Sequence, residues 1–422
     1  MTPTGRWAAC GAMALTGDPD GPPLAPATDA ASAVDAALAP FGLDAGVLAE
    51  RAASAGLARG GRVACGRGSR LLRAADGWLA LTLSRPDDVA SLPALFEAPF
   101  DGEPDGTGDG APWERVAGLV ASRPAAEVAA RAELLGVPCG IVGEAAGPPP
   151  APVDAAGGAL REPPYVVDLS ALWAGPLATS CLLRAGATVV KVEDPRRPDG
   201  ARLADPAFHD LLNGGKLSVA LDLSSADGRS ALAALVERAG IVVTSARARA
   251  IEALGLDPEA ALAAATDKVW VAITAHGWGS DRVGFGDDVA AAAGLVAWHP
   301  GDGEPRFAAD AVADPLCGAF AAHSALDAWQ QGGRHFLDAA MVAAARSVAP
   351  PPGEPAQAAE PARAAELARA VEPGRAVEPG RAVEVGWSVD SEPVAPPRAR
   401  TAERRAAALG ADTAAVLAAV SA

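Results

Sequence analysis

The sequence is poor in cysteine, in aromatic residues and in positive charge, and each shortage excludes a class of protein. The five cysteines are isolated and form no CxxC pair, so neither a zinc site nor a disulfide framework is expected, and the pattern is typical of a reduced, cytoplasmic protein. The 52 Asp and Glu exceed the 35 Lys and Arg, which gives a net charge of −17. This charge argues against a nucleic-acid-binding protein, because phosphate contacts require a basic face.

Long hydrophobic runs are also absent. No apolar run has the length of a membrane span, and the N-terminus lacks a basic start followed by an apolar core, so we expect neither a membrane protein nor a secreted one. Half of the 422 residues are hydrophobic, which is enough to bury one large core or two ordinary ones.

The stretch 165–224 carries the clearest pattern of secondary structure. Tyr165–Leu169 is an apolar run that predicts a short buried strand. Small and branched residues from Trp173 to Leu183 recur at helical spacing, and Thr188–Val192 predicts a second strand. A strand, a helix and a strand in this order predict a parallel crossover, which brings strand ends and helix N-termini together where anionic ligands bind.

Further strands are predicted near Val219, Ile241 and Val269, and they alternate with Ala- and Leu-rich helices. This alternation predicts an α/β fold with a doubly wound parallel (Rossmann-like) sheet in a large domain, together with a smaller α/β domain. We expect the following segments: a helical and loop region at 1–60, the small domain at 61–146, a Pro/Gly/Ala-rich linker at 147–162, the large domain at 163–348, a low-complexity insert at 349–396, and a C-terminal helix that packs on the large domain at 397–422.

Three phrases in the large domain resemble a known family. VVDLSALWAGPLATSCLLRAGATVVKVEDP, LLNGGKLSVALDL and LDLSSADGRSALAALVERAGIVV are similar to the opening of the class III CoA-transferases, which include formyl-CoA transferase, carnitine CoA-transferase, bile-acid-inducible protein F and α-methylacyl-CoA racemase. The phrase CGAMALTGDPDGPPL resembles a middle segment of the family but stands here at the start of the chain. The resemblance therefore implies the family fold with a rearranged order of segments, and an interlocked homodimer.

The resemblance also implies a nucleophile. Asp314, in ADAVADPLCGAFAAHSALDAW, matches the catalytic aspartate of the family, whose carboxylate attacks an acyl-CoA thioester to form a mixed anhydride and then an aspartyl-CoA thioester. The alternative is that Asp314 caps a helix. Asp310 lies four residues earlier, and Asp29 lies in a phrase that resembles a second copy of the same region.

Other residues match family positions that bind CoA. The resemblance implies that CoA is a substrate and a product of the reaction and that no metal is needed. Gly66 and Gly68 in CGRGSR match the glycine-rich loop that covers the active site, where backbone N–H groups can meet the thioester oxygen. For each basic residue a solvated surface charge is the alternative. The resemblance assigns CoA binding to Leu172, Trp173, Ala174, Arg196, Arg197, Lys216, Arg247 and His276.

Two departures from the family pattern bear on the reaction. An Asn-Phe-Arg-Pro-Gly phrase is replaced here by Thr244–Arg249, and the His-Asp pair of racemase-like members is replaced by Asp287-Asp288. Because that His moves the α-proton in the racemases, its loss favours CoA transfer over racemisation of a 2-methylacyl-CoA. An inactive protein of the same fold that binds CoA or a partner is the remaining alternative, and the sequence does not identify the acyl donor or acceptor.

Overall fold

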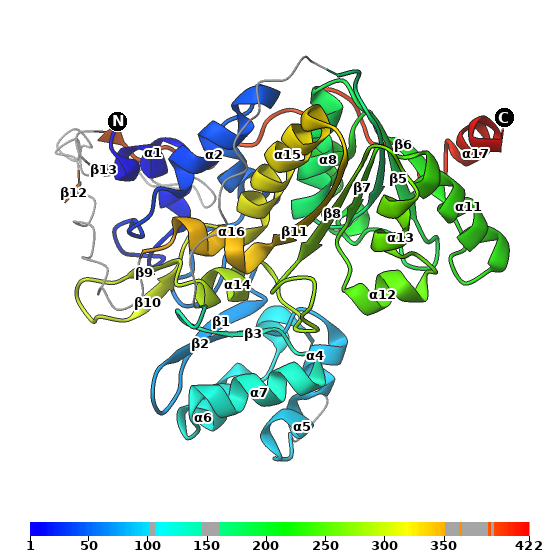
Figure 1. Ribbon diagram of the computed structural model, residues 1–422. Helices are drawn as coiled ribbons and strands as arrows, with labels where there is room; N and C mark the ends of the chain where they lie inside the picture. The colour runs from blue at the N-terminus through cyan, green and yellow to red at the C-terminus, as the bar shows by residue number, and fades with distance from the viewer. Residues whose placement is uncertain (101–105, 146–160, 351–362, 365–386, 390–391, 422) are drawn as a thin grey trace.

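The computed structural model describes residues 1–100, 106–145, 161–350, 363–364, 387–389 and 392–421. A six-stranded sheet forms the centre of the large domain (Figure 1). Its strands lie in the order β11-β8-β7-β4-β5-β6, and every neighbouring pair is parallel. The strands are β4 (Tyr165–Leu169), β5 (Thr188–Glu193), β6 (Leu217–Ala220), β7 (Ile241–Thr244), β8 (Lys268–Thr274) and β11 (Arg334–Ala340).

Helices cover both faces of this sheet. Val166 and Val167 are neighbours in β4, yet they pack into different hydrophobic clusters, because successive side chains of a strand point to opposite faces. Val166 shares its cluster with residues of α8 (Ala174–Arg184) and α15 (Ala313–Gln331). Val167 shares its cluster with residues of α11 (Ala226–Arg238) and α17 (Thr413–Ser421). The expected α/β class with a doubly wound parallel sheet is confirmed.

The small domain is built on the antiparallel sheet β1-β2-β3, with strands β1 (Ser69–Arg73), β2 (Trp78–Thr82) and β3 (Cys139–Ile141). Its β2 and β3 pack against α14 (Gly286–Ala292) of the large domain. Gly140 makes this approach possible, since a Cβ there would lie 2.4 Å from the carbonyl oxygen of Asp288. The helices of the domain are α4 (Pro86–Ala90), α5 (Leu92–Phe96), α6 (Trp113–Ala121) and α7 (Ala125–Leu135).

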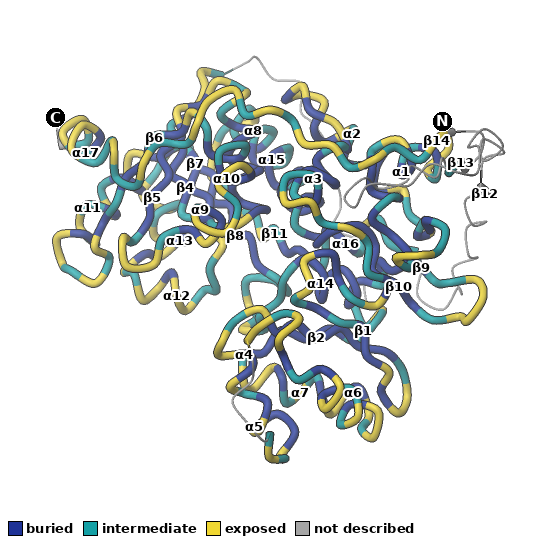
Figure 2. Tube along the Cα trace, turned by 180° about the vertical axis from the view of Figure 1, so that it is seen from behind, coloured by how far each residue is buried: buried dark blue, intermediate teal, exposed yellow. Residues whose placement is uncertain are grey.

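The first sixty residues and the C-terminal segment lie together. Figure 2 shows β13 (Trp387–Val389) and β14 (Glu392–Pro393) beside α1 (Pro3–Ala9). The amide N of Ala395 donates to the carbonyl of Ala8 at 2.9 Å, and Arg400 forms an ion pair with the buried Glu50. The N-terminal segment contains α1, η1 (Met13–Leu15), α2 (Ala30–Leu38), η2 (Ala39–Phe41), η3 (Ala45–Ala49) and α3 (Glu50–Ala55).

Shorter elements complete the chain. They are η4 (Gly108–Gly110), α9 (Ala201–Ala204), α10 (Pro206–Asn213), α12 (Ala248–Ala253), α13 (Pro258–Ala263), the antiparallel pair β9 (Val296–Trp298) and β10 (Pro305–Phe307), α16 (Met341–Val348) and β12 (Arg363–Ala364). Most of the expected linker at 147–162 and of the expected insert at 349–396 lies outside the described residues, and the domain limits stay a prediction.

Among the helices of the described residues, no single one has the length and apolar character to cross a membrane. The helices at Ala30–Phe41 and Ala45–Ala55 are bent by 119° relative to each other. Taken together they have the length and composition of a membrane span, and nothing more points to one.

Candidate active site

A cavity of about 370 Å³ lies where the three parts of the chain meet. The N-terminal segment contributes Arg51, and the small domain contributes the loop before β1 and the end of β2. The large domain contributes the start of α8, the helices α9 and α10, and the N-terminal turns of α14 and α15. The cavity is therefore assembled from segments that are distant in sequence.

Asp314 lines this cavity from the first turn of α15 and is partly accessible from it. Gly286 packs directly against its carboxylate, because a Cβ on Gly286 would lie 2.4 Å from Asp314 Oδ2 and 2.3 Å from the carbonyl oxygen of Ala311. Burial raises the pKa of Asp314 to about 7; Arg51 opposes the rise, and Asp287 and other nearby carboxylates add to it. The carboxyl can thus gain or lose a proton near neutral pH.

Arg51 and Asp310 form the ion pair of the cavity wall. Arg51 Nη2 and Nε donate to the two oxygens of Asp310 at 2.5 and 2.9 Å. Asp310 is completely buried, while the guanidinium of Arg51 also lies 5.4 Å from the ring centroid of Trp173. Because this pairing uses the fork of Arg51 on Asp310, the other carboxyl groups of the site have no such partner.

Asp287 and Asp288, at the start of α14, point to different neighbours. Asp287 lines the cavity, where its Oδ1 accepts from the amide N of Ala311 at 3.0 Å. Burial and the nearby Asp310 raise the pKa of Asp287 to about 6. Asp288 instead accepts from Thr82 Oγ1 of the small domain at 2.9 Å, and burial raises the pKa of Asp288 to about 7.

Gly66 and Gly68 lie where the sequence places the glycine-rich loop, on the wall of this cavity. A Cβ on Gly66 would lie 3.2 Å from a guanidinium nitrogen of Arg51, and one on Gly68 would lie 2.1 Å from Ser84 Oγ. Within the described ranges, the N–H groups of these two glycines have no hydrogen-bond acceptor.

Two of the residues matched to CoA binding lie at the same cavity. Leu172 and Trp173 line it, whereas Ala174 is buried behind them. Leu172 is 44% exposed and has a left-handed φ of 69°. Its backbone N–H donates a hydrogen bond to Asp199 Oδ1 at 3.0 Å, which helps to hold this conformation. Trp173 packs edge to face on Phe208 with ring centroids 5.2 Å apart. An exposed Leu beside a buried aromatic pair offers an apolar path into the cavity.

The expected phosphate-binding arginines follow strand ends rather than line this cavity. Arg196 and Arg197 are exposed after β5, and Arg196 pairs with Asp194 at 2.7 Å. Arg247 follows β7, donates to the carbonyl of Asp281 at 3.2 Å, and lines a separate cavity of about 290 Å³. All three lie at the carboxyl edge of the sheet, where ligands of open α/β folds bind.

Lys216 and His276 do not line the cavity. The ammonium of Lys216 is buried and donates to Asp168 at 3.0 Å, to Thr179 Oγ1 at 2.7 Å and to Asn213 Oδ1 at 2.9 Å. These bonds engage the donors of Lys216 inside the fold, so this structure does not present it to a ligand as the resemblance implied. Burial and Arg282 lower the pKa of His276 to about 4, which keeps it neutral at pH 7.

The predicted second copy of the nucleophile also lies elsewhere. Asp29 precedes α2, is exposed, and does not line the cavity. No group of three or more His, Cys, Asp or Glu that could hold a metal is found in the described part of the chain.

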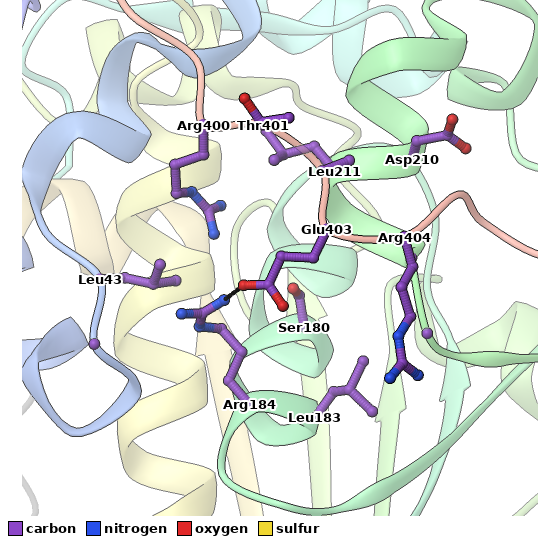
Figure 3. A pocket seen from close by; sticks show the side chains of 14 residues that line it. Leu43, Ser180, Leu183, Arg184, Asp210, Leu211, Arg400, Thr401, Glu403 and Arg404 are labelled. Atoms are coloured by element: carbon purple, nitrogen blue, oxygen red, sulfur yellow. Dashed lines mark hydrogen bonds and ion pairs between the residues drawn. The ribbon is translucent and has the colours of Figure 1, made fainter.

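A larger cavity of about 460 Å³ contains none of the residues that the sequence singles out. Figure 3 shows it between the C-terminal segment and the helices α8 and α10, with three arginines around it. Arg184 donates to the carbonyl of Phe41 at 2.9 Å and to Glu403 at 3.4 Å, and Arg400 is paired with Glu50. Two of its arginines therefore tie segments of the protein together.

Comparison with known proteins gives several partial matches. The chain is 29% identical over 182 residues to the succinate–glutarate CoA-transferase of Agrobacterium fabrum, a match that covers 38% of this chain and 45% of the relative. It is 35% identical over 129 residues to the succinyl-CoA:mesaconate CoA-transferase of Haloarcula hispanica, covering 28% of this chain and 32% of the relative. The matches span less than half the length of these relatives.

Among solved structures, a hypothetical protein from Mycobacterium tuberculosis is 29% identical, with a TM-score of 0.40, over 43% of this chain and 55% of that one. A CAIB/BAIF family protein from Brucella suis is 26% identical, with a TM-score of 0.40, over 43% and 53% of the two chains. The model of CoA-transferase family III matches residues 164–375, half of the 422-residue chain. The protein that carries Asp314 beside this cavity therefore belongs to CoA-transferase family III.

Proposed function

We propose that this protein transfers coenzyme A from an acyl-CoA to a carboxylic acid, with Asp314 as the nucleophile. The observation that carries the proposal is the position of the Asp314 carboxylate, which is partly accessible at the wall of a 370 Å³ cavity that also holds free backbone N–H groups. Family membership supports the reaction class.

The geometry suits acyl transfer to a carboxylate. The Asp314 oxygen attacks the thioester carbon, CoA leaves, and an aspartyl anhydride remains on the protein. Gly66 and Gly68 line the same cavity, and we propose that their N–H groups stabilise the negative charge on the thioester oxygen. CoA then attacks the anhydride to give the aspartyl-CoA thioester, from which the acceptor acid takes CoA.

We further propose that CoA reaches the cavity from the carboxyl edge of the sheet. Leu172 and Trp173 line the cavity on that side, while Arg196, Arg197 and Arg247 are positively charged groups at the ends of β5 and β7. A nucleotide phosphate bound by these arginines leaves the pantetheine arm to run along the apolar wall. Arg196→Ala is expected to raise the KM for CoA esters while leaving the single-turnover rate at saturation unchanged.

Succinyl-CoA is the first probe to use, because the names of the two curated relatives both include succinate or its CoA ester. Incubation with succinyl-CoA and hydroxylamine is expected to leave a hydroxamate on Asp314, detected by peptide mass spectrometry. Asp314→Asn should neither form this adduct nor release CoA. Release of CoA by that variant at the wild-type rate would contradict the proposal.

Racemisation is the second candidate reaction, and one observation bears on it. Asp287 lines the cavity at the position where racemase-like relatives are expected to carry His. The discriminating measurement is deuterium exchange at the α-carbon of 2-methylacyl-CoA. Transfer predicts CoA exchange with labelled acid and no α-exchange, whereas an inactive protein that only binds CoA predicts neither.

We also propose an interlocked homodimer, on the strength of family membership. The glycine loop and Asp314 already meet within one chain, so the second copy is expected to add stability rather than these groups. Light scattering after size exclusion should give about twice the 42.0 kDa chain mass; a monomer that transfers CoA would refute the dimer and leave the reaction intact.

A further inference from the structure

Asp287 is a second carboxyl group on the wall of the cavity that holds Asp314, and the reaction proposed above does not use it. Gly286 adjoins both of them. Gly286 directly precedes Asp287 in the chain, and its Cα touches Asp314, since a Cβ there would lie 2.4 Å from Asp314 Oδ2. Asp287 is anchored at the same place by the amide N of Ala311, three residues before Asp314.

The charges around Asp287 leave it without a counter-ion of its own. Arg51 is the cation that faces it, and its guanidinium is already bidentate on Asp310. Ser69 Oγ, from β1, offers only a hydrogen bond at 3.3 Å. Two neighbouring carboxyl groups in a buried site resist ionising together. Among the described residues, Arg51, which is already bound to Asp310, is the cation that acts on both, so we take one proton on the pair as the starting form.

The remaining titratable neighbours do not change this count. Burial raises the pKa of the Cys65 thiol, which is therefore neutral and carries no charge toward Asp287. Asp288, the next residue in α14, is buried against Thr82 and is not part of the cavity wall.

We propose that Asp287 relays the proton between Asp314 and the sulfur of CoA. The proton moves from Asp314 to Asp287 as the Asp314 oxygen bonds to the thioester carbon; as the C–S bond breaks, that proton passes to sulfur and CoA leaves as the thiol. Asp287 is then ionised, beside an Asp314 that is neutral as an anhydride. When CoA returns, its thiol proton goes back to Asp287, sulfur bonds to the Asp314 acyl carbon, and the C–O bond of the anhydride breaks to release the donor acid as its carboxylate, so atoms and charge balance in both directions.

The relay rests on the proposed CoA transfer and deepens it. It gives each carboxyl a separate role, with Asp314 forming the covalent bond and Asp287 moving the proton. It also accounts for the position of Asp287, which is buried but open to the cavity on one side. A purely structural role would need the Oδ1 that accepts from Ala311 and a partner for Ser69 Oγ; Asn retains the oxygen, and its NH₂ group can donate to Ser69 Oγ.

The test compares Asp287→Asn with the wild type and with Asp288→Asn, a matched change in the adjacent buried aspartate that does not line the cavity. Single-turnover release of CoA from succinyl-CoA is measured across the pH range and in D₂O. The wild type and Asp288→Asn should show a bell-shaped pH profile and a solvent isotope effect. Asp287→Asn should be slower by about 10²-fold, with a single ionisation and no isotope effect.

A bell-shaped profile with a wild-type rate in Asp287→Asn would overturn the relay and leave CoA transfer standing. If the wild type itself releases no CoA and traps no acyl group, the proposed function fails, and the relay fails with it. Asp287→Glu provides a second variant if the amide does not fold. Glu keeps a titratable group at this position, so the relay predicts that the pH profile of this variant stays bell-shaped. A profile that has lost both its acidic and its alkaline limb would also refute the relay.

Discussion

Replacing Asp314 by Asn should stabilise the protein at alkaline pH while removing the proposed nucleophile. Burial raises the pKa of Asp314 from an ordinary 3.8 to about 7. Because the folded protein holds this proton more tightly than the unfolded chain, the carboxyl contributes its full stability below about pH 4. That contribution is lost as the pH rises from about 4 to about 7.

The size of the effect follows from the shift. One pKa unit corresponds to about 1.4 kcal/mol, so three units give an upper value of about 4 kcal/mol. Asp314 keeps some contact with solvent in the cavity, and we therefore expect about 2 kcal/mol. Asn does not ionise, and its oxygen still suits the N–H of Gly286, so the variant should keep the stability that the wild type loses.

The assay is urea unfolding of wild type and Asp314→Asn at about pH 5 and about pH 8, followed by tryptophan fluorescence. The variant should gain relative to the wild type at both values, and by clearly more at about pH 8 than at about pH 5, where only part of the contribution has been lost. Asp20→Asn, at an exposed position, is the charge-matched control and should give the same difference at both values. An equal difference at both values for Asp314→Asn would refute the argument that ionising this carboxyl costs stability.

Three further predictions concern packing and buried charge. Gly286→Ala should abolish hydroxamate trapping, because the new Cβ would displace the Asp314 carboxylate, which it would approach to 2.4 Å. Arg51→Gln should lower the free energy of unfolding by about 3–5 kcal/mol, measured in urea, because it leaves Asp310 buried without its counter-charge. Lys216→Met should cost a similar amount, about 3–5 kcal/mol, and should leave the KM for CoA esters unchanged in the variant that remains folded.

Matched controls separate these effects from general damage. Gly118→Ala, in open space on α6, should leave trapping intact and stabilise the protein by about 0.5–1 kcal/mol. Arg6→Gln removes a half-exposed pair with Asp35 and should cost about 1 kcal/mol or less. A higher KM for succinyl-CoA in Lys216→Met would contradict this prediction and would indicate that Lys216 contributes to CoA binding.

The fold could be predicted from the sequence because its signals are local. The apolar run Tyr165–Leu169 and the helical spacing that follows it form β4 and α8 as expected. The small-domain hairpin turns at Asp76-Gly77, between β1 and β2, and Asp-Gly is a dipeptide typical of tight hairpin turns. In each case the residues that specify the element are adjacent in the chain, so short-range patterns suffice.

The site could be predicted only in part. The phrase around Asp314 and the glycine loop carried a recognisable order of residues, and both lie at the cavity. Arg51 carried no such signal, because it is one arginine on a short helix and acquires its role by meeting Asp310 from 259 residues away. Lys216 is the opposite case. The sequence shows a positive charge at a position matched to CoA binding, but it does not show that the buried Asp168 pairs with that charge inside the fold.

The pairing of Arg51 with Asp310 makes the two halves of the chain dependent on each other. A fragment starting at the family match, residue 164, would contain the acidic wall of the cavity but no guanidinium to neutralise it. Such a fragment is expected to form the active site only when residues 1–163, which carry both Arg51 and the glycine loop, are supplied as a separate polypeptide. Complementation between the two pieces would then serve as an on–off control of the enzyme in a cell.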